Sequence, residues 1–334
     1  MGAVVAGPFF EQLEVGQVER GAPGLTLTDG LAAAHRAILG GRTRLALDAA
    51  LCAAVTGDAR PLADPQLVCD VAIGQSTLLT QRVIANLFYR GLSFRRLPRI
   101  GDTLRTSTEV VALRQTSAKP GRPATGLAAL RIRTVDQEAR PVLDFHRCAM
   151  LPLRDPQGET GRADDLAAVG AVESDAASLA AAVAGWDLTV IGTGDDAAAL
   201  GAGASWQVES GDVVSCAPEL ARLSLNVAAA HHDAGANASG RRLVYGGHTI
   251  GLAAAQATRA LPNLVAILAW HGCDHLAPVF EGDTLSSLIE VERVESLAHA
   301  DGGALLHLRS RVRARRADGA DAEVLDWRFA AVAA

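Results

Sequence analysis

Stretch 225–251 holds several residues whose types and spacing could do chemistry. Asn226 and His231 lie five positions apart, and a polar, glycine-rich segment then leads to Gly246 and Gly247. Histidine suits acid and base catalysis because its ordinary pKa lies near neutral, whereas asparagine can only hold a water molecule by hydrogen bonds. A glycine pair that opens a helix offers free N–H groups and lets a ligand approach the backbone. The alternative is a structural histidine, a capping asparagine and a tight helix entry.

The composition indicates a globular chain and excludes several classes of partner. The 334 residues allow two domains, and 49% apolar residues suffice for a core. A net charge of −6 argues against sequence-independent nucleic-acid binding, and no apolar run is long enough to span a membrane. The five cysteines form no CxxC pair, which favours a reducing compartment over disulfides or structural zinc. The N-terminal sequence lacks signal-peptide features, so we expect a cytoplasmic protein.

The chain contains one internal repeat. The tetrapeptide Gly-Asp-Thr-Leu occurs at 101–104 and again at 282–285, an offset of 181 residues. Val-Leu-Asp-Phe at 142–145 is answered by Val-Leu-Asp-Trp at 324–327, an offset of 182 residues. An internal similarity at such a spacing predicts two copies of one structural unit.

Each copy contains the same order of expected elements. Alternation of apolar and polar residues predicts half-buried strands at 105–116, 127–135, 286–296 and 304–316. An apolar stretch with helical spacing precedes each set, at 67–86 and at 248–261. We therefore expect an α+β fold in which each copy packs one helix on an antiparallel sheet. The expected division is a first domain at 1–154, a linker rich in Asp, Ala and Gly at 155–203, and a second domain at 204–334.

The residues that could do chemistry occur in the second copy alone. When the two copies are aligned, Gly41 lies opposite Asn226 and Ala46 lies opposite His231. Aligning Leu-Val-Cys-Asp with Leu-Val-Tyr-Gly places Asp70 opposite the first glycine of the pair. This asymmetry predicts one catalytic copy and one degenerate copy that leaves room for the ligand.

These patterns resemble those of the MaoC-like hydratases and dehydratases. The resemblance rests on the two copies, on "FFEQLEVGQ" at 9–17, on the two Gly-Asp-Thr-Leu segments and on "NVAAAHHD…RRLVYGGHTIGLA" at 226–253. It implies two tandem hotdog domains, each a long helix wrapped by an antiparallel sheet. The nearest subgroup is the mesaconyl-CoA hydratase (β-methylmalyl-CoA dehydratase) type. The broader family carries Asp-x-Asn-Pro-Leu-His, whereas this chain has Asn226 in place of the Asp and no proline.

The resemblance implies a hydro-lyase of the (R)-specific type. Its reaction would be reversible addition of water to a short enoyl-CoA, with branched or dicarboxylic acyl groups such as mesaconyl-CoA included. His231 would act as acid and base, and Asn226 would hold the water. The residues implied for the thioester oxygen and the substrate are Gly246, Gly247, Tyr245 and His248, and those for a phosphate or carboxylate are Arg241 and Arg242. We expect no metal and no redox cofactor, coenzyme A only as part of the substrate, and a homo-oligomer such as a dimer.

Two other functions remain open on the sequence. A hotdog acyl-CoA thioesterase would need a carboxylate near the helix start, for which Asp70 of the first copy is available. A non-catalytic acyl-CoA binding subunit is suggested by the amide, rather than an acid, at Asn226.

Two further motifs have plainer explanations. "VIGTGDDA" at 190–197 resembles a dinucleotide fingerprint but lacks the third glycine and a supporting βαβ unit, so we interpret it as a chance match. "HGCDH" at 271–275 would need a helical face and a third ligand to bind a metal. A strand or loop is favoured there, with a structural role or a place in the pocket wall.

Overall fold

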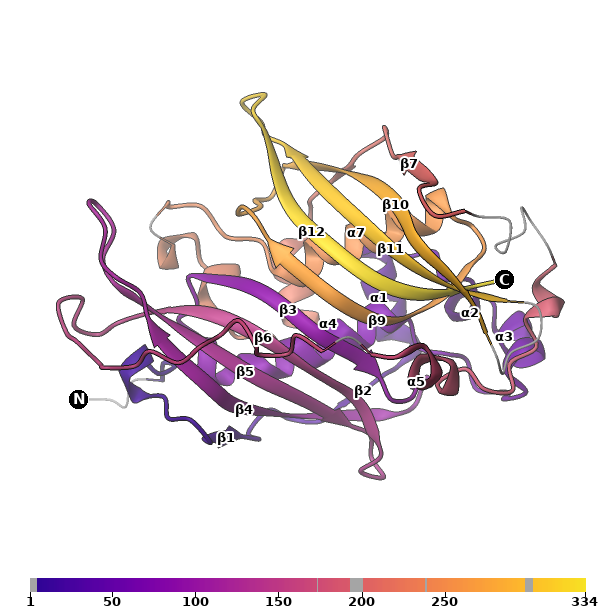
Figure 1. Ribbon diagram of the computed structural model, residues 1–334, viewed down its shortest axis with the longest axis horizontal. Helices are drawn as coiled ribbons and strands as arrows, with labels where there is room; N and C mark the ends of the chain where they lie inside the picture. The colour runs from indigo at the N-terminus through magenta and orange to yellow at the C-terminus, as the bar shows by residue number, and fades with distance from the viewer. Residues whose placement is uncertain (1–4, 173, 193–200, 238, 298–302) are drawn as a thin grey trace.

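The computed structural model describes residues 5–172, 174–192, 201–237, 239–297 and 303–334, and one antiparallel sheet dominates it (Figure 1). Its described strands are β1 (Val18–Glu19), β2 (Leu25–Thr26), β3 (Ala85–Phe94), β4 (Thr103–Gln115), β5 (Thr125–Val135), β6 (Pro141–Pro152), β7 (Ser205–Gln207), β8 (Asp212–Val213), β9 (Leu264–His275), β10 (Thr284–Ser296), β11 (Ala304–Arg315) and β12 (Asp321–Ala333). The order across the sheet is β1-β4-β5-β6-β3-β9-β12-β11-β10-β7, with β2 beside β4 and β8 beside β10. The four predicted strands are confirmed as β4, β5, β10 and β11, with ends that differ by at most two residues.

The two long central helices lie against one face of this sheet (Figure 1), and the expected α+β class is confirmed. In Figure 1 the two long central helices, α4 and α7, lie behind the strands. The described α-helices are α1 (Asp29–Leu39), α2 (Arg44–Leu47), α3 (Ala49–Thr56), α4 (Pro65–Gln75), α5 (Ala176–Ala181), α6 (Ala217–Leu223) and α7 (Gly246–Ala260). Short 3-10 turns are η1 (Phe10–Gln12), η2 (Ser76–Thr80), η3 (Leu188–Ile191), η5 (Ala229–His231) and η6 (Ala234–Ala236).

The repeated Gly-Asp-Thr-Leu segment is a turn that starts a strand. In each copy the aspartate Oδ2 accepts the backbone N–H three residues upstream, at 2.9 Å for Asp102 and 3.0 Å for Asp283. The glycines before them, Gly101 and Gly282, have φ values of 98° and 88°, which side chains with a Cβ rarely adopt. The tetrapeptide therefore recurs because the same turn feeds β4 and β10.

One glutamine on each central helix shows which residues of the two copies correspond to each other. Gln75 Nε2 donates to the Leu104 carbonyl at 3.0 Å, and Gln256 Nε2 donates to the Leu285 carbonyl at 2.9 Å. Gln75 and Gln256 are separated by 181 positions, which is also the offset of the Gly-Asp-Thr-Leu repeat. The two helices are therefore equivalent residue by residue at this offset.

This offset corrects the sequence alignment of the helix starts. Gly246, the first residue of α7, is equivalent to Pro65, the first residue of α4. The predicted pairing of Gly246 with Asp70 is wrong by five residues. Similar letters before the helix, Leu-Val-Cys and Leu-Val-Tyr, misled the alignment because one copy has them inside the helix and the other before it.

The predicted helix at 67–86 is also too long. Helix α4 ends at Gln75, and the hydroxyls of Ser76 and Thr77 donate to carbonyls three residues upstream at 2.6 and 2.7 Å. Such side-chain bonds compete with the helical ladder. The chain therefore tightens into η2, and β3 begins at residue 85.

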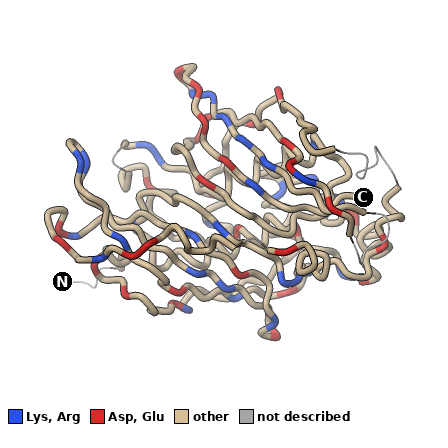
Figure 2. The backbone as a smooth tube through the Cα atoms, in the orientation of Figure 1, with Lys and Arg blue, Asp and Glu red and all other residues tan. Residues whose placement is uncertain are grey.

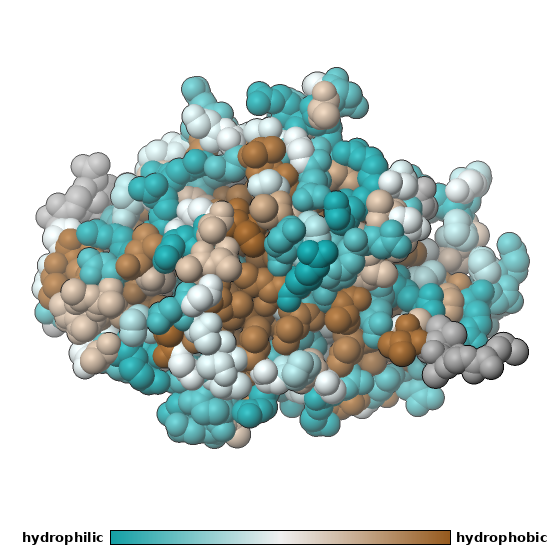
Figure 3. Space-filling model, turned by 180° about the vertical axis from the view of Figure 1, so that it is seen from behind, coloured by the Kyte–Doolittle hydropathy of each residue, from teal (hydrophilic) through white to brown (hydrophobic). Residues whose placement is uncertain are grey.

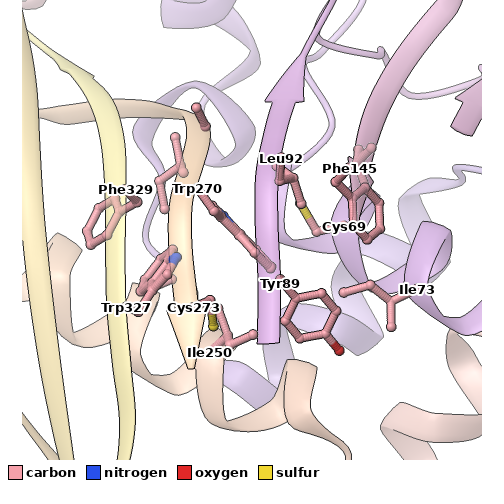
Figure 4. Close-up of a cluster of buried hydrophobic side chains, with 14 of the residues drawn as sticks. Cys69, Ile73, Tyr89, Leu92, Phe145, Ile250, Trp270, Cys273, Trp327 and Phe329 are labelled. Carbon is pink, nitrogen blue, oxygen red and sulfur yellow. The ribbon is translucent and has the colours of Figure 1, made fainter. Parts of the chain in front are cut away.

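Strands β3 and β9 join the two copies into one sheet. Their pairing is antiparallel, with Tyr89 opposite Cys273. Trp270 lies edge-on to both Tyr89 and Trp327, with ring centroids 5.7 Å apart in each pair (Figure 4). Edge-to-face aromatic pairs contribute about 0.5–1.5 kcal/mol each beyond their buried area. The junction is therefore a core in its own right, shared by the two copies.

Described parts of the segment between 155 and 192 contact the first copy. Asp164 N–H donates to the Leu113 carbonyl at 3.2 Å, and Asp187 N–H donates to the Val55 carbonyl at 2.9 Å. Residues 190 and 191 of the fingerprint-like segment belong to η3, whereas residues 193–197 lie outside the described residues.

Charged residues are spread along the exposed strands, whereas apolar side chains gather on one face of the molecule (Figure 2, Figure 3). Acidic and basic residues are interspersed along the exposed strands (Figure 2). Viewed from behind, apolar side chains gather near the centre of the face and polar ones surround them (Figure 3). Within the described parts of the chain, no helix has the length and hydropathy needed to cross a membrane.

Candidate active site

A cavity of about 370 Å³ lies where the two copies meet. The first copy lines it from η2, β3 and β6, and the second copy lines it from the loops around α7 and the end of β9. Its main polar side chains are Thr77, Thr80, Asn86, Tyr89, Arg147, Asn226, His231, Tyr245, Thr249 and His275. Among the described residues that line it there is no aspartate or glutamate.

His231 presents a basic nitrogen to this cavity. Its Nδ1 lies 2.9 Å from the Leu243 carbonyl oxygen. A carbonyl can only accept a hydrogen bond, so Nδ1 carries the proton and Nε2 keeps its lone pair. Burial lowers the pKa of His231 to about 4, so the ring is neutral at pH 7. No described residue bonds Nε2 of His231, so this nitrogen is free to accept a hydrogen bond from a ligand.

Asn226 places an amide group in the lining of the same cavity as His231. Asn226 is 3% exposed, and its Oδ1 accepts the Ala228 N–H at 2.9 Å. This bond fixes which way the amide faces and leaves Nδ2 as the group that can donate to a ligand. The backbone carbonyl of Asn226 accepts a hydrogen bond from His232 Nε2 at 2.6 Å, so His232 positions this residue.

The segment that carries Asn226 and His231 is attached to the first copy. Val227 N–H donates to Thr77 Oγ1, and Ala229 N–H donates to the Gln81 carbonyl, both at 2.9 Å. Gly74 of α4 lies so close that any Cβ there would overlap the Ser224 carbonyl oxygen. The site is therefore formed by both copies, although Asn226 and His231 come from one.

The start of α7 supplies free N–H groups. Tyr245 precedes the helix and makes no side-chain cap, and no described residue accepts a hydrogen bond from Gly246 or Gly247. Gly246 lines the cavity. A Cβ at Gly246 would lie 2.7 Å from His275 Nε2, so a side chain would disturb this wall. An uncapped helix N-terminus of this kind favours a developing negative charge.

The equivalent place in the first copy is closed. Pro65 has no N–H, and Asp64 Oδ1 caps the helix by accepting the Gln66 N–H at 2.8 Å. The cavity there, lined by Gly41 and Thr43 among others, measures about 20 Å³. It is too small for an acyl group, and neither of the first two residues of α4 has a free N–H to offer one.

Four other predicted site residues lie at or outside the edge of the cavity. Gly247 packs against Asp70 and the Tyr245 ring and does not line it. His248 is fully buried, neither ring nitrogen has a hydrogen-bond partner among the described residues, and it lies outside the lining. Arg241 and Arg242 also lie outside the lining. The Arg241 guanidinium stacks 3.8 Å from the Phe280 ring centroid, and Arg242 forms an ion pair with Glu281 at 2.8 Å.

Tyr245 lies inside the cavity wall. Its ring centroid is 5.8 Å from that of His231, and its hydroxyl donates to the Asp70 carbonyl at 3.4 Å. It therefore buttresses the imidazole and joins α7 to α4.

The two histidines of "HGCDH" separate. A β-bulge at His271, between the pairs Arg328–Gly272 and Phe329–Trp270, puts His271 and His275 in different surroundings. His271 stacks on His307, whereas His275 lines the cavity with its Nε2 buried and unbonded by any described residue. Burial lowers the pKa of His275 to about 4. Its place in the pocket wall is one of the two roles that the sequence suggested.

Arg147 is one of the lining residues that sequence reasoning missed. It is 3% exposed, and its Nε and Nη2 donate to Ser76 and Thr80 at 2.9–3.0 Å. Two signals could have identified it. In strand β6 it has the inward parity of Phe145, and at the repeat offset of 182 it stands where the second copy has Phe329.

Comparison with known proteins agrees with this architecture. No family model matches the chain. β-Methylmalyl-CoA dehydratase of Chloroflexus aurantiacus is 30% identical over 304 residues, covering 85% of this chain and 82% of the relative. Mesaconyl-CoA hydratase of Cereibacter sphaeroides is 28% identical over 305 residues, covering 90% and 88%.

A solved structure gives the same fold. A conserved protein of Mycobacterium tuberculosis, described as having a double hotdog fold and as essential for bacterial survival during infection, is 56% identical. The TM-score is 0.88, and the match covers 98% of each chain. The predicted double hotdog architecture is thereby confirmed.

Proposed function

This chain belongs to the MaoC-like double-hotdog hydratases and dehydratases, and we propose that its cavity hydrates a short enoyl-CoA thioester reversibly. It is an enzyme of the hydro-lyase class, as its named relatives are. The observation that carries the proposal is His231 in the lining of the cavity, with Nδ1 bonded and Nε2 bonded by no described residue, together with Asn226 and the start of α7 in the same lining.

Each group has one task in this reaction. His231 Nε2 takes a proton from water while the water oxygen bonds to the β-carbon. The imidazolium then gives that proton to the α-carbon, so the elements of one water are added and the histidine is restored. Asn226 Nδ2 donates to the water oxygen and orients it. The N–H of Gly246 stabilises the thioester oxygen as negative charge develops there.

The proposed substrate is a short acyl-CoA of the mesaconyl-CoA kind, and the addition is of the (R)-specific type. Two relatives are named for mesaconyl-CoA and β-methylmalyl-CoA, and the cavity volume of about 370 Å³ suits a short acyl group. Arg241 stacks on Phe280, which lines the cavity, so a phosphate of coenzyme A is the ligand proposed for Arg241.

The two alternatives fit the cavity less well. A thioesterase of this fold would need a carboxylate at the thioester, but the candidate, Asp70, is fully buried and bonded to His35 at 2.8 Å and to Gln66 at 3.3 Å. A non-catalytic binding subunit would have no need of an imidazole held in one tautomer with its basic nitrogen free.

The test follows the ultraviolet absorbance of the enoyl thioester with crotonyl-CoA and mesaconyl-CoA. We expect wild type to turn over at least one of them and His231→Ala to be slower by about 10²–10⁴-fold. His146→Ala is the matched control, because His146 lies on the opposite face of β6 from the cavity. An inert wild type, an unaffected His231→Ala variant, or release of free thiol would contradict the proposal.

We also propose that chains associate into a homo-oligomer, with a dimer as the simplest case. The apolar centre of the face in Figure 3 supports this, because exposed apolar surface of that kind is common where proteins meet. Sedimentation equilibrium would decide it, and a monomer at micromolar concentration would contradict it.

A further inference from the structure

We propose that Arg147 binds a carboxylate on the acyl group of the substrate, so that the enzyme selects dicarboxylic enoyl-CoA over neutral enoyl-CoA. The inference deepens the proposed hydration and rests on it for the position of the thioester. It assigns to a residue of the first copy the choice of substrate for a reaction catalysed by the second.

Arg147 carries a charge that no described residue neutralises. Its hydrogen bonds go to a hydroxyl and a carbonyl of Ser76 and to the hydroxyl of Thr80, all of them neutral. No described carboxylate lies within ion-pair distance of it. Arg131 on the neighbouring strand differs, because it makes a two-pronged bond to Asp144 at 2.9 and 2.6 Å. Buried charges normally have a partner, and arginine stays protonated when buried.

The space in front of Arg147 suits an anion. Arg147 lines the cavity, and no described lining residue is acidic. Its hydrogen bonds use Nε and Nη2, and Nη1 makes none with a described residue. Arg147 also contributes to lowering the pKa of His231, so both side chains act on the same space. A carboxylate can accept two parallel N–H bonds from a guanidinium, which gives direction as well as affinity.

Comparison of the two copies shows that the second has no counterpart of the Arg147 guanidinium. At the offset of 182 the counterpart of Arg147 is Phe329, and at 181 the counterparts of Ser76 and Thr80 are Ala257 and Leu261. The guanidinium and both hydroxyls that hold it are thus absent from the second copy. In the second copy Ala257 still belongs to α7, which continues to Ala260, so the turn η2 and the guanidinium that holds it are features of the first copy.

The geometry points to one class of substrate. In the proposed hydration the thioester oxygen binds at Gly246 and the β-carbon at His231, and the far end of a short acyl chain would then face the wall formed by the first copy. A methyl group there would leave the guanidinium unpaired, whereas a carboxylate would neutralise it. The expected ligand is therefore an enoyl thioester whose acyl chain ends in a carboxylate.

The first test compares substrates in an Arg147→Gln variant. The ratio of kcat/KM for mesaconyl-CoA to that for crotonyl-CoA should fall by about 30- to 1,000-fold, as when one member of a buried charge pair is removed. Arg147→Lys should recover part of the ratio, and Arg131→Gln should leave it unchanged. An equal loss on both substrates would overturn the proposal, because it would show a structural role.

The second test needs neither a variant nor turnover. Succinyl-CoA and butyryl-CoA have acyl chains of equal length that end in a carboxylate and a methyl group, and neither can be hydrated. Calorimetry on the wild-type protein should show succinyl-CoA binding at least about 30-fold more tightly. Equal affinities would overturn the role of Arg147 even if hydration is observed. Preferential binding with an enzyme inert to both enoyl-CoAs would contradict the proposed function and keep this inference.

Discussion

The base role proposed for His231 depends on the protein keeping this histidine neutral. A hydrogen bond from Nδ1 to the Leu243 carbonyl sets the tautomer, and burial lowers the pKa to about 4. The same burial makes the protonated ring that forms during reaction strongly acidic. It therefore returns its proton readily to the α-carbon, as reversible addition of water requires.

This pKa predicts an unusual pH profile. The neutral imidazole is the active form for hydration, so activity is present above the pKa and is lost as pH falls through it. We expect log kcat/KM to stay flat from pH 8 to about pH 5 and to fall below that, whereas an ordinary histidine would lose half its activity near pH 6.5. Steady-state hydration rates across this range would check it, with circular dichroism at each pH to confirm that the protein is folded. A decline centred at pH 6.5 would show that His231 is not shielded from water.

The residues proposed for the hydration step were predicted from the sequence, whereas Arg147, proposed for substrate choice, was not. Asn226, His231 and Gly246 were predicted and meet at one cavity. Their spacing is local, so short-range patterns could reveal them. Arg147 comes from a strand some eighty residues earlier, and only folding brings it to His231. The placement of His248 also depended on the fold, since one step along a helix turns a side chain by about 100°.

At the scale of elements, the approach of α4 to the loop before Asn226 governs the site. Gly74 lets the helix touch the Ser224 carbonyl, and Leu225 next to it has a φ of 62°, which is rare for a residue with a Cβ. Thr77 then accepts the Val227 N–H. The loop is thus held in a bent conformation by a helix of the other copy.

Replacing Gly74 by alanine tests this contact. The added methyl group overlaps the Ser224 carbonyl, so the helix or the loop must shift, and we expect stability to fall by about 1–3 kcal/mol. Hydration should fall more than stability alone explains, because Asn226 moves with the loop. Urea denaturation and kcat would be measured beside Gly272→Ala, whose added Cβ meets nothing within 4 Å. Equal, small effects in both variants would mean that the loop is not held by α4.

The elements themselves were predictable to different degrees. Strands β4, β5, β10 and β11 follow from alternation of period two, which depends only on one face being buried. The end of α4 could not be predicted in this way, because Ser76 and Thr77 are compatible with a helix by residue type. Only the structure shows that their hydroxyls bond to helix carbonyls. The pairing of β3 with β9 could not be read from pattern, since the two strands lie far apart in sequence.

At the scale of the whole molecule, the two copies contribute different residues to one cavity. The first copy closes its own helix start with Asp64 and Pro65 and gives Arg147 to the shared cavity. The second copy leaves its helix start open at Gly246 and contributes His231. Because β3 and β9 form one continuous sheet, the two sets of residues are held at a fixed separation. Neither copy alone has a complete site.

The whole fold should also be sensitive to acid. His231, His248 and His275 are kept neutral inside the protein, and burial lowers the pKa of each to about 4 from 6.5. An unfolded chain binds protons at these histidines below pH 6.5, whereas the folded chain does not until about pH 4. Their contribution to stability is therefore complete above pH 6.5 and is lost as pH falls toward 4, at up to about 1.4 kcal/mol per pH unit for each.

The free energy of unfolding, measured in urea at half-unit steps from pH 7.5 to 4.5, would show this slope. We expect it to correspond to an uptake of close to three protons by these residues near pH 5. His248→Leu is the informative variant, because neither nitrogen of His248 has a hydrogen-bond partner among the described residues. It should reduce the slope by about one proton without lowering stability at pH 7, since an apolar side chain loses no bond there. A slope unchanged by this variant would mean that His248 is protonated inside the fold, and the two central helices would then have to open enough to admit water to it.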